Sequence, residues 1–123
     1  MTVTMPALPN SELAVMELLW RRGRLPARQI QEALYPDDSR PQHGTVQRLL
    51  KRLEDKGYVV RDRDLGVNLF SPTLSRETYA GNQLEALANR LTEGSLVPII
   101  TRLVEDDRLS SAEIERLRAF LDE

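Results

Sequence analysis

The 123-residue sequence contains no cysteine and a single histidine, His43. The absence of cysteine excludes disulfide bonds, thiolate metal sites and a cysteine nucleophile. One histidine is too few for a multi-histidine metal site. The sequence also lacks a glycine-rich phosphate loop and an evident pair of carboxylates in an apolar pocket. We therefore expect a protein that is not an enzyme and that carries no metal or cofactor.

Aromatic residues make up only 5% of the chain, and no apolar run approaches the ~20 residues that span a bilayer. The core must therefore be built mainly from leucine, valine, isoleucine and alanine. Residues 1–9 contain neither the basic stretch nor the apolar stretch of a secretion signal. The composition is that of one small globular domain, with or without an appendage. These features predict a cytosolic protein without membrane insertion.

Charge is distributed unevenly along the chain, although the net charge is only −2. Residues 1–74 carry 11 basic and 9 acidic side chains, whereas residues 75–123 carry 6 and 10. The positive excess is concentrated in residues 40–63, which hold 7 basic and 3 acidic side chains. A basic centre followed by an acidic tail indicates either a nucleic-acid surface or simply solvated helix faces.

Hydrophobic periodicity and capping signals predict six helices and one β-hairpin. Ser110 and Glu113 are spaced as a capping box at the start of the last helix. The helices are expected at about residues 9–22, 26–35, 42–56, 75–92, 95–105 and 110–121. The hairpin is expected at residues 58–70, around a polar tip that contains glycine. This order predicts a mainly α fold with a small β-hairpin wing: a winged helix-turn-helix domain over residues 1–74, then a helical dimerisation region over residues 75–123.

The helix expected at residues 42–56 is amphipathic in a way that suits DNA. Val46, Leu49, Leu50 and Leu53 recur at helical spacing and predict a buried stripe. The opposite face gathers small, cationic and amide-bearing residues: Gly44, Gln47, Arg48, Lys51 and Arg52. A helix of this kind fits the major groove, which is about 12 Å wide.

Each side chain on that face has a chemical role to offer. Arg48 and Lys51 can bind guanine edges or phosphates, and Gln47 can bond adenine through two hydrogen bonds. His43 and Thr45 lie in the first turn, where backbone N–H groups also favour a phosphate.

Gly44 admits two explanations: the missing side chain lets DNA approach the backbone closely, or the helix is irregular near its start. Arg52 and Lys56 are each expected either at a phosphate or in an ion pair with Glu54, Asp55 or the wing. In the hairpin, Arg61 and Arg63 alternate with acidic residues, so strand geometry predicts one cationic and one anionic face. The predicted DNA-binding residues are His43, Gly44, Thr45, Gln47, Arg48, Lys51, Arg52, Arg61 and Arg63.

The C-terminal helices carry more leucine and isoleucine than they can bury among themselves at this size. We expect a second copy of the chain to cover these side chains and form a homodimer. The predicted dimerisation residues are Leu84, Leu87, Leu91, Leu96, Ile99, Ile100, Leu103, Ile114, Leu117 and Leu121.

Three motifs carry a resemblance to a known family. They are LAVMELLW at residues 13–20, the spaced pattern from Thr45 to Gly57, and Gly94-Ser95-Leu96. Over residues 8–123 the chain resembles the BlaI/MecI/CopY family of bacterial repressors, typified by penicillinase repressors. The resemblance implies a homodimer that places one winged helix on each half of a pseudo-palindromic double-stranded operator. It also implies dimerisation through the C-terminal helices.

The chain departs from the family pattern in three places. Val67 follows Gly66 where family wings commonly carry an arginine, which puts one backbone contact in question. Arg102 and Leu103 stand where penicillinase-type members are cleaved between Asn and Phe, so that cleavage specificity is not expected. An inactivating protease is an expected partner with no cut site assigned. The absence of cysteine excludes the copper sensing of other members.

Two functions therefore compete: a dimeric, sequence-specific DNA-binding repressor and a winged-helix protein-interaction module that does not bind DNA. The outward set Gln47, Arg48 and Lys51 favours DNA, because a protein interface more often exposes aromatic residues or methionine. Salt dependence separates the two, since DNA affinity falls steeply as salt rises.

Overall fold

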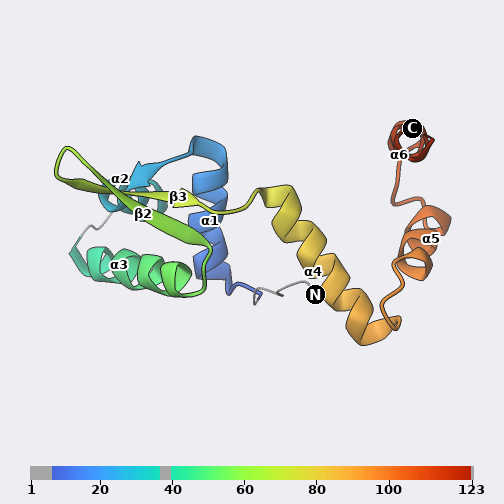
Figure 1. The fold of residues 1–123 in the computed structure, drawn as a ribbon, viewed down its shortest axis with the longest axis horizontal. Helices are drawn as coiled ribbons and strands as arrows, with labels where there is room; N and C mark the ends of the chain where they lie inside the picture. Colours follow the sequence, from blue (N-terminus) through green and yellow to red (C-terminus); the bar gives the residue numbers. More distant parts are fainter. Residues whose placement is uncertain (1–6, 37–39, 123) are drawn as a thin grey trace. The chain divides into compact units, whose positions relative to one another are not determined.

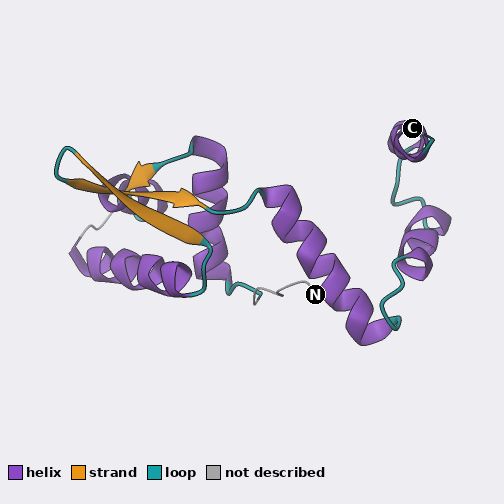
Figure 2. Ribbon diagram, viewed as in Figure 1, coloured by secondary structure: helices purple, strands orange, loops and turns teal. Residues whose placement is uncertain are grey.

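The computed structural model describes residues 7–36 and 40–122, without the side chains of residues 40–43. Its elements in chain order are α1 (Asn10–Arg22), β1 (Leu25–Pro26), α2 (Ala27–Leu34), α3 (Arg40–Asp55), β2 (Val59–Asp64), β3 (Val67–Pro72), α4 (Arg76–Leu91), α5 (Val97–Glu105) and α6 (Ser111–Leu121) (Figures 1 and 2). The chain divides into two compact units, Met1–Asn82 and Gln83–Glu123. The first turns of α4 thus belong to the N-terminal unit.

The N-terminal unit combines helices α1 to α3 with a three-stranded antiparallel sheet of order β1-β3-β2. Strands β2 and β3 form a hairpin in register from Val59 opposite Pro72 to Asp64 opposite Val67. The turn between them is Leu65–Gly66, and both residues have positive φ, +50° and +79°. Figure 1 shows α3 running beside this hairpin. The predicted winged helix-turn-helix fold is confirmed.

Strand β1 is an element that the sequence pattern did not predict. It is two residues long, and Leu25 lies opposite Phe70 in β3. Two residues are too few to show the alternation by which strands are recognised. Pro26 has no N–H to donate and is tolerated because β1 lies at the edge of the sheet.

Helix α3 begins at Arg40, two residues earlier than the pattern predicts. Pro41 therefore lies in its first turn, where a missing N–H costs nothing because no intrahelical acceptor exists for it. The inner stripe is buried as expected: Val46, Leu49, Leu50 and Leu53 are at most 4% exposed. This stripe packs in the same core cluster as α1, α2 and the sheet, so α3 is held with its other face outward.

An aromatic cluster joins the start of α4 to this core. The indole N–H of Trp20 donates to the carbonyl of Leu74 (2.9 Å), and the backbone N–H of Leu8 donates to the hydroxyl of Tyr79 (3.0 Å). The Tyr79 ring lies 5.7 Å from the rings of both Trp20 and Tyr58. Residues 74–79 are therefore fixed to the N-terminal unit.

The C-terminal unit holds the end of α4, α5 and α6. The predicted capping box of α6 is present: the Ser110 hydroxyl accepts from the Glu113 N–H (3.1 Å), and the Glu113 carboxylate accepts from the Ser110 N–H (3.0 Å). Ala88 is fully buried, but Leu91, Phe120 and Leu121 are each about 70% exposed. The helices of this unit leave much of their apolar surface open to solvent. Within the described part of the chain, no helix is both long and apolar enough to traverse a lipid bilayer.

Candidate nucleic-acid interface

The outward face of α3 consists of Gly44, Gln47, Arg48, Lys51 and Arg52. The side chains of Gln47, Arg48, Lys51 and Arg52 are all exposed. Because the opposite stripe of the helix is buried in the core, these side chains are displayed on a rigid element. The amphipathic arrangement expected from the sequence is therefore present.

Gly44 lies inside the regular helix and not at a frayed end. A Cβ built at Gly44 would meet the Arg48 Nη1 atom at 3.5 Å, which is an ordinary contact. Its φ is not positive, so neither space nor backbone conformation requires glycine here. The structure therefore shows no steric or conformational requirement for glycine at this position.

The first turns of α3 carry two further predicted residues. Thr45 is half-buried, and its hydroxyl accepts a long hydrogen bond from Arg48 (3.4 Å). His43 lies within α3, but its side chain is outside the described residues.

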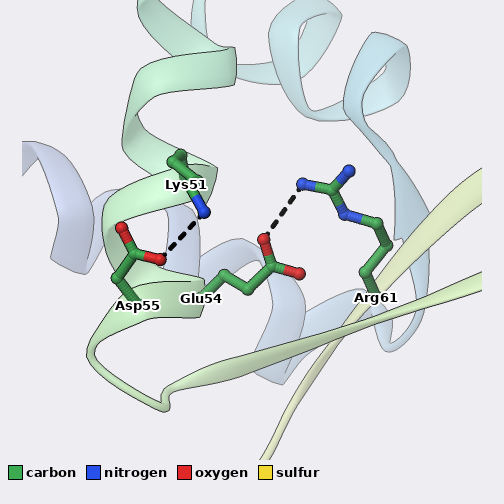
Figure 3. Close-up of polar contacts among 4 residues, drawn as sticks. All are labelled: Lys51, Glu54, Asp55 and Arg61. Atoms are coloured by element: carbon green, nitrogen blue, oxygen red, sulfur yellow. Dashed lines mark hydrogen bonds and ion pairs between the residues drawn. The ribbon is translucent and has the colours of Figure 1, made fainter.

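Two of the predicted cations are engaged by carboxylates near the C-terminal end of α3 (Figure 3). Lys51 Nζ lies 3.0 Å from the Asp55 carboxylate, one helical turn away. Arg61 reaches from β2 to the Glu54 carboxylate at 3.0 Å. Its guanidinium also lies over the Phe70 ring, 5.2 Å from the centroid. Helix α3 is thus tied to the wing through Glu54 and Arg61.

The hairpin register separates the wing charges by face. Arg61 is paired with Phe70 and Arg63 with Asn68, whereas the alternating acids Asp62 and Asp64 are paired with Leu69 and Val67. Since side chains of opposed residues share a face, both arginines lie on the face that α3 approaches through Glu54. This is the charge separation that strand alternation predicts.

A cleft of about 300 Å³ lies between α3, the start of α2 and the wing turn. Gln47 lines it from α3, Arg28 from α2, and Gly66 and Asn68 from the wing. Arg28 and Asn68 were not singled out from the sequence. Asn68 lies opposite Arg63 in the hairpin and therefore on the same face of the wing. This pairing follows from the hairpin register and not from the sequence pattern.

Lys56 has a structural role and does not belong to the outward face. Its Nζ atom lies 2.6 Å from the carboxylate of Glu12, whose side chain is only 2% exposed. The pair connects the first turn of α1 to the residue that follows α3. Glu12 also lies in the first turn of α1, at the positive end of the helix dipole. Among the described residues, no cluster of three potential metal ligands accompanies these groups.

The chain as a whole is similar to known proteins of one family. The pattern of the family described as "Penicillinase repressor" matches residues 8–123. The penicillinase repressor of Bacillus licheniformis is 26% identical over 118 residues, covering 96% of this chain and 91% of the relative. The transcriptional regulator BlaI of Mycobacterium tuberculosis is 34% identical over 118 residues, covering 94% of this chain and 83% of the relative.

A solved structure shows the same fold. It is a solution structure of the monomeric form of Bacillus licheniformis BlaI in complex with the blaP half-operator, with a TM-score of 0.51 and 23% identity. The match covers 61% of this chain and 90% of that one. The match of the family pattern over nearly the whole length and the 34% identity to BlaI place the chain in the penicillinase repressor family, a non-enzymatic family of winged-helix transcriptional repressors.

Proposed function

We propose that the chain acts as a homodimeric, sequence-specific repressor that binds a pseudo-palindromic DNA operator with one winged helix on each half-site. The observation that carries the proposal is the outward face of α3: cationic and amide side chains displayed on a helix whose other face is locked in the core. This is the geometry by which a recognition helix enters the major groove.

In this proposal the contacts are divided between base edges and phosphates. Gln47 and Arg48 contact base edges, and Lys51 and Arg52 contact either bases or phosphates. Thr45 and His43 lie where the DNA backbone passes the start of α3, and Gly44 lets it approach. Arg61 and Arg63 bind phosphates from the cationic face of the wing.

The half-operator complex of the Bacillus licheniformis relative supports this assignment, because that protein has the same fold and binds DNA. The cleft beside Gln47 gives further support. It lies between α3 and the wing and is lined by the hydrogen-bonding side chains of Arg28 and Asn68. A sugar-phosphate strand between helix and wing would find donors on both sides.

Dimerisation is proposed for residues 75–123, and DNA binding for residues 1–74. The exposed apolar surface supports it: Leu84, Leu103 and Leu117 are 36–43% exposed and Leu91 and Leu121 are 71% exposed. The other proposed dimerisation residues, each half-buried within the single chain, are Leu87, Leu96, Ile99, Ile100 and Ile114. A cleft of about 480 Å³ in this unit, lined by Leu109, Leu117 and Phe120 among others, offers a place for a partner side chain.

The proposal places the protein in the cytoplasm, since genomic DNA is its ligand there. An inactivating protease is a further proposed partner. The reason is the resemblance to penicillinase-type repressors, whose repression ends when the repressor is cleaved. No cut site is assigned to it.

Selection from a pool of random-sequence duplexes tests the proposed function. The full chain should enrich a motif with two related half-sites, and its affinity for the enriched duplex should fall steeply with salt. On a log–log plot the slope should be about −0.9 for each phosphate neutralised. A protein-interaction module would enrich no motif and would ignore DNA even at low salt, which would contradict the proposal.

A further inference from the structure

The two ion pairs at the end of α3 differ in how firmly they hold their cations. Lys51 and Asp55 are on the same helix, and their side chains are 65% and 61% exposed. Exposed pairs of this kind are screened by water and contribute little. A DNA phosphate can therefore replace Asp55 as the partner of Lys51 without difficulty.

Arg61 is held in a more restrictive way. Its side chain and that of Glu54 are 39% and 29% exposed, and the guanidinium is also placed over Phe70. A planar guanidinium that is stacked on a ring and bonded to a carboxylate is fixed in direction as well as in charge. Arg61 can reach a phosphate only by leaving Glu54.

The consequence of this restraint differs between random DNA and an operator. Binding to random DNA rests almost entirely on phosphate contacts, in whatever register the cations can reach. A restrained arginine contributes little to such binding. On a correctly docked operator the wing lies in one defined place, so a phosphate in reach of Arg61 can exchange with Glu54.

We propose that Glu54 is a positioning residue that withholds Arg61 from random DNA and releases it on the operator, so that the two complexes differ in the number of phosphate contacts. The proposal rests on the DNA-binding function proposed above. Glu54 acts by positioning Arg61 and by competing with phosphate for it. It thereby removes one phosphate contact from random binding, while operator binding includes the cost of separating the ion pair.

The test compares Glu54→Gln with Asp55→Asn, which removes the same charge one residue along from the exposed pair. The probes are the duplex enriched from the random pool and a scrambled duplex of the same length and composition. For Glu54→Gln the salt slope on the scrambled duplex should steepen by about 0.9, the value for one added phosphate contact. The slope on the enriched duplex should stay that of the parent, because Arg61 already contacts a phosphate there. Asp55→Asn should leave both slopes close to those of the parent.

A double variant identifies Arg61 as the group released. Adding Arg61→Gln to Glu54→Gln should abolish the gain on the scrambled duplex. Arg61→Gln alone should weaken binding to the enriched duplex and leave the scrambled duplex unaffected. The thermal midpoint of each variant checks that the fold is kept.

An unchanged slope on the scrambled duplex in Glu54→Gln would overturn the inference, as would an equal increase in slope on the enriched duplex or a gain that persists without Arg61. Weaker operator binding with no change in slope would instead show that Glu54 only fastens the wing to α3, and would also overturn it. Failure of the proposed function can be distinguished from failure of this inference, because the parent protein would then not prefer the enriched duplex. In that case the inference would also be wrong.

Discussion

Gly44 is the residue where helix stability and DNA contact are expected to oppose each other. Glycine in a helix interior is about 1 kcal/mol less favourable than alanine. The space around Gly44 accepts a Cβ at an ordinary distance from Arg48. A helix selected for stability alone would carry alanine at this position, so we attribute the glycine to the approach of the DNA backbone.

Gly44→Ala should therefore raise the free energy of unfolding by about 0.5–1 kcal/mol and weaken binding to the enriched duplex. Denaturant unfolding and a DNA titration measure the two effects. Gly81→Ala in α4 is the matched control, since a Cβ there meets nothing within 4 Å and its φ is not positive. Gly81→Ala should raise the free energy of unfolding without changing the affinity for DNA. Parental DNA affinity in Gly44→Ala would contradict the explanation.

Lys56 is the residue whose role the sequence left most open. Its charge suited a phosphate contact as well as an ion pair, and the structure pairs it with Glu12, 44 residues away in the chain. A helical pattern cannot indicate such a partner, because the contact depends on how α1 crosses α3. A local sequence pattern cannot predict a bond between a side chain and an element that is far away in the sequence.

Lys56→Met should destabilise the fold by about 3 kcal/mol, because it leaves the buried Glu12 carboxylate without its partner. In the double variant Glu12→Gln/Lys56→Met, much of this loss should be recovered. Urea unfolding of both proteins measures the difference. If the single and double variants were equally unstable, the ion pair would not be the reason for the loss.

At the scale of elements, α3 was predictable and β1 was not. The buried stripe of α3 repeats over four apolar positions, although the helix begins two residues before the predicted start. The hairpin was predictable from two β-prone runs around a glycine. Strand β1 exists only because Leu25 comes to lie opposite Phe70, a tertiary event with no local signal. The same holds for the pairing of Glu54 with Arg61.

Helix α6 offers a test of a capping box predicted from sequence. Hydrogen bonds from the backbone and the side chain of Ser110 lower the pKa of the Glu113 carboxyl from its ordinary value. A carboxyl whose pKa is lowered in the folded state stabilises it above the unfolded pKa. That contribution is lost as pH falls through the lowered folded value.

Ser110→Ala should therefore raise the pKa of Glu113 towards its ordinary value, as followed by an NMR titration of the carboxyl. It should also increase hydrogen exchange in the first turn of α6, because an orphan N–H loses its acceptor. Ser111→Ala changes the neighbouring serine, which makes no capping bond in the described structure. Part of the pKa shift should remain, because the backbone N–H at position 110 still donates to Glu113. Unchanged hydrogen exchange in the first turn of α6 would argue against the box.

At the scale of the whole molecule, the two units differ in how they bury apolar side chains. The N-terminal unit has a core cluster drawn from α1, α2, α3 and the sheet. The C-terminal unit leaves Leu91, Val97, Phe120 and Leu121 largely exposed. The sequence predicted this imbalance from the count of leucine and isoleucine in short helices. It did not indicate that the first turns of α4 pack with the winged helix, because that packing depends on Tyr79.

Leu117→Asp, and likewise Leu87→Asp, should convert the proposed dimer into monomers that bind half-sites poorly. A charge placed in an apolar interface loses hydration without gaining a partner. Sedimentation velocity gives the oligomeric state. Leu65→Asp at the wing turn, where the side chain is 97% exposed, is the control and should leave the dimer intact. If the Leu117→Asp protein sedimented as a dimer, the dimer interface would not include Leu117.

The central claim is that the outward face of α3 recognises base sequence, and Arg48 tests it most directly. Duplexes that carry each base substitution of the enriched motif should be titrated with the parent, Arg48→Gln, and Arg21→Gln as a control on α1. We expect Arg48→Gln to lose about 1–3 kcal/mol on the enriched duplex and to stop distinguishing bases at one position of each half-site. Arg21→Gln should match the parent. If Arg48→Gln distinguished every position as the parent does, α3 would not be the element that recognises the sequence.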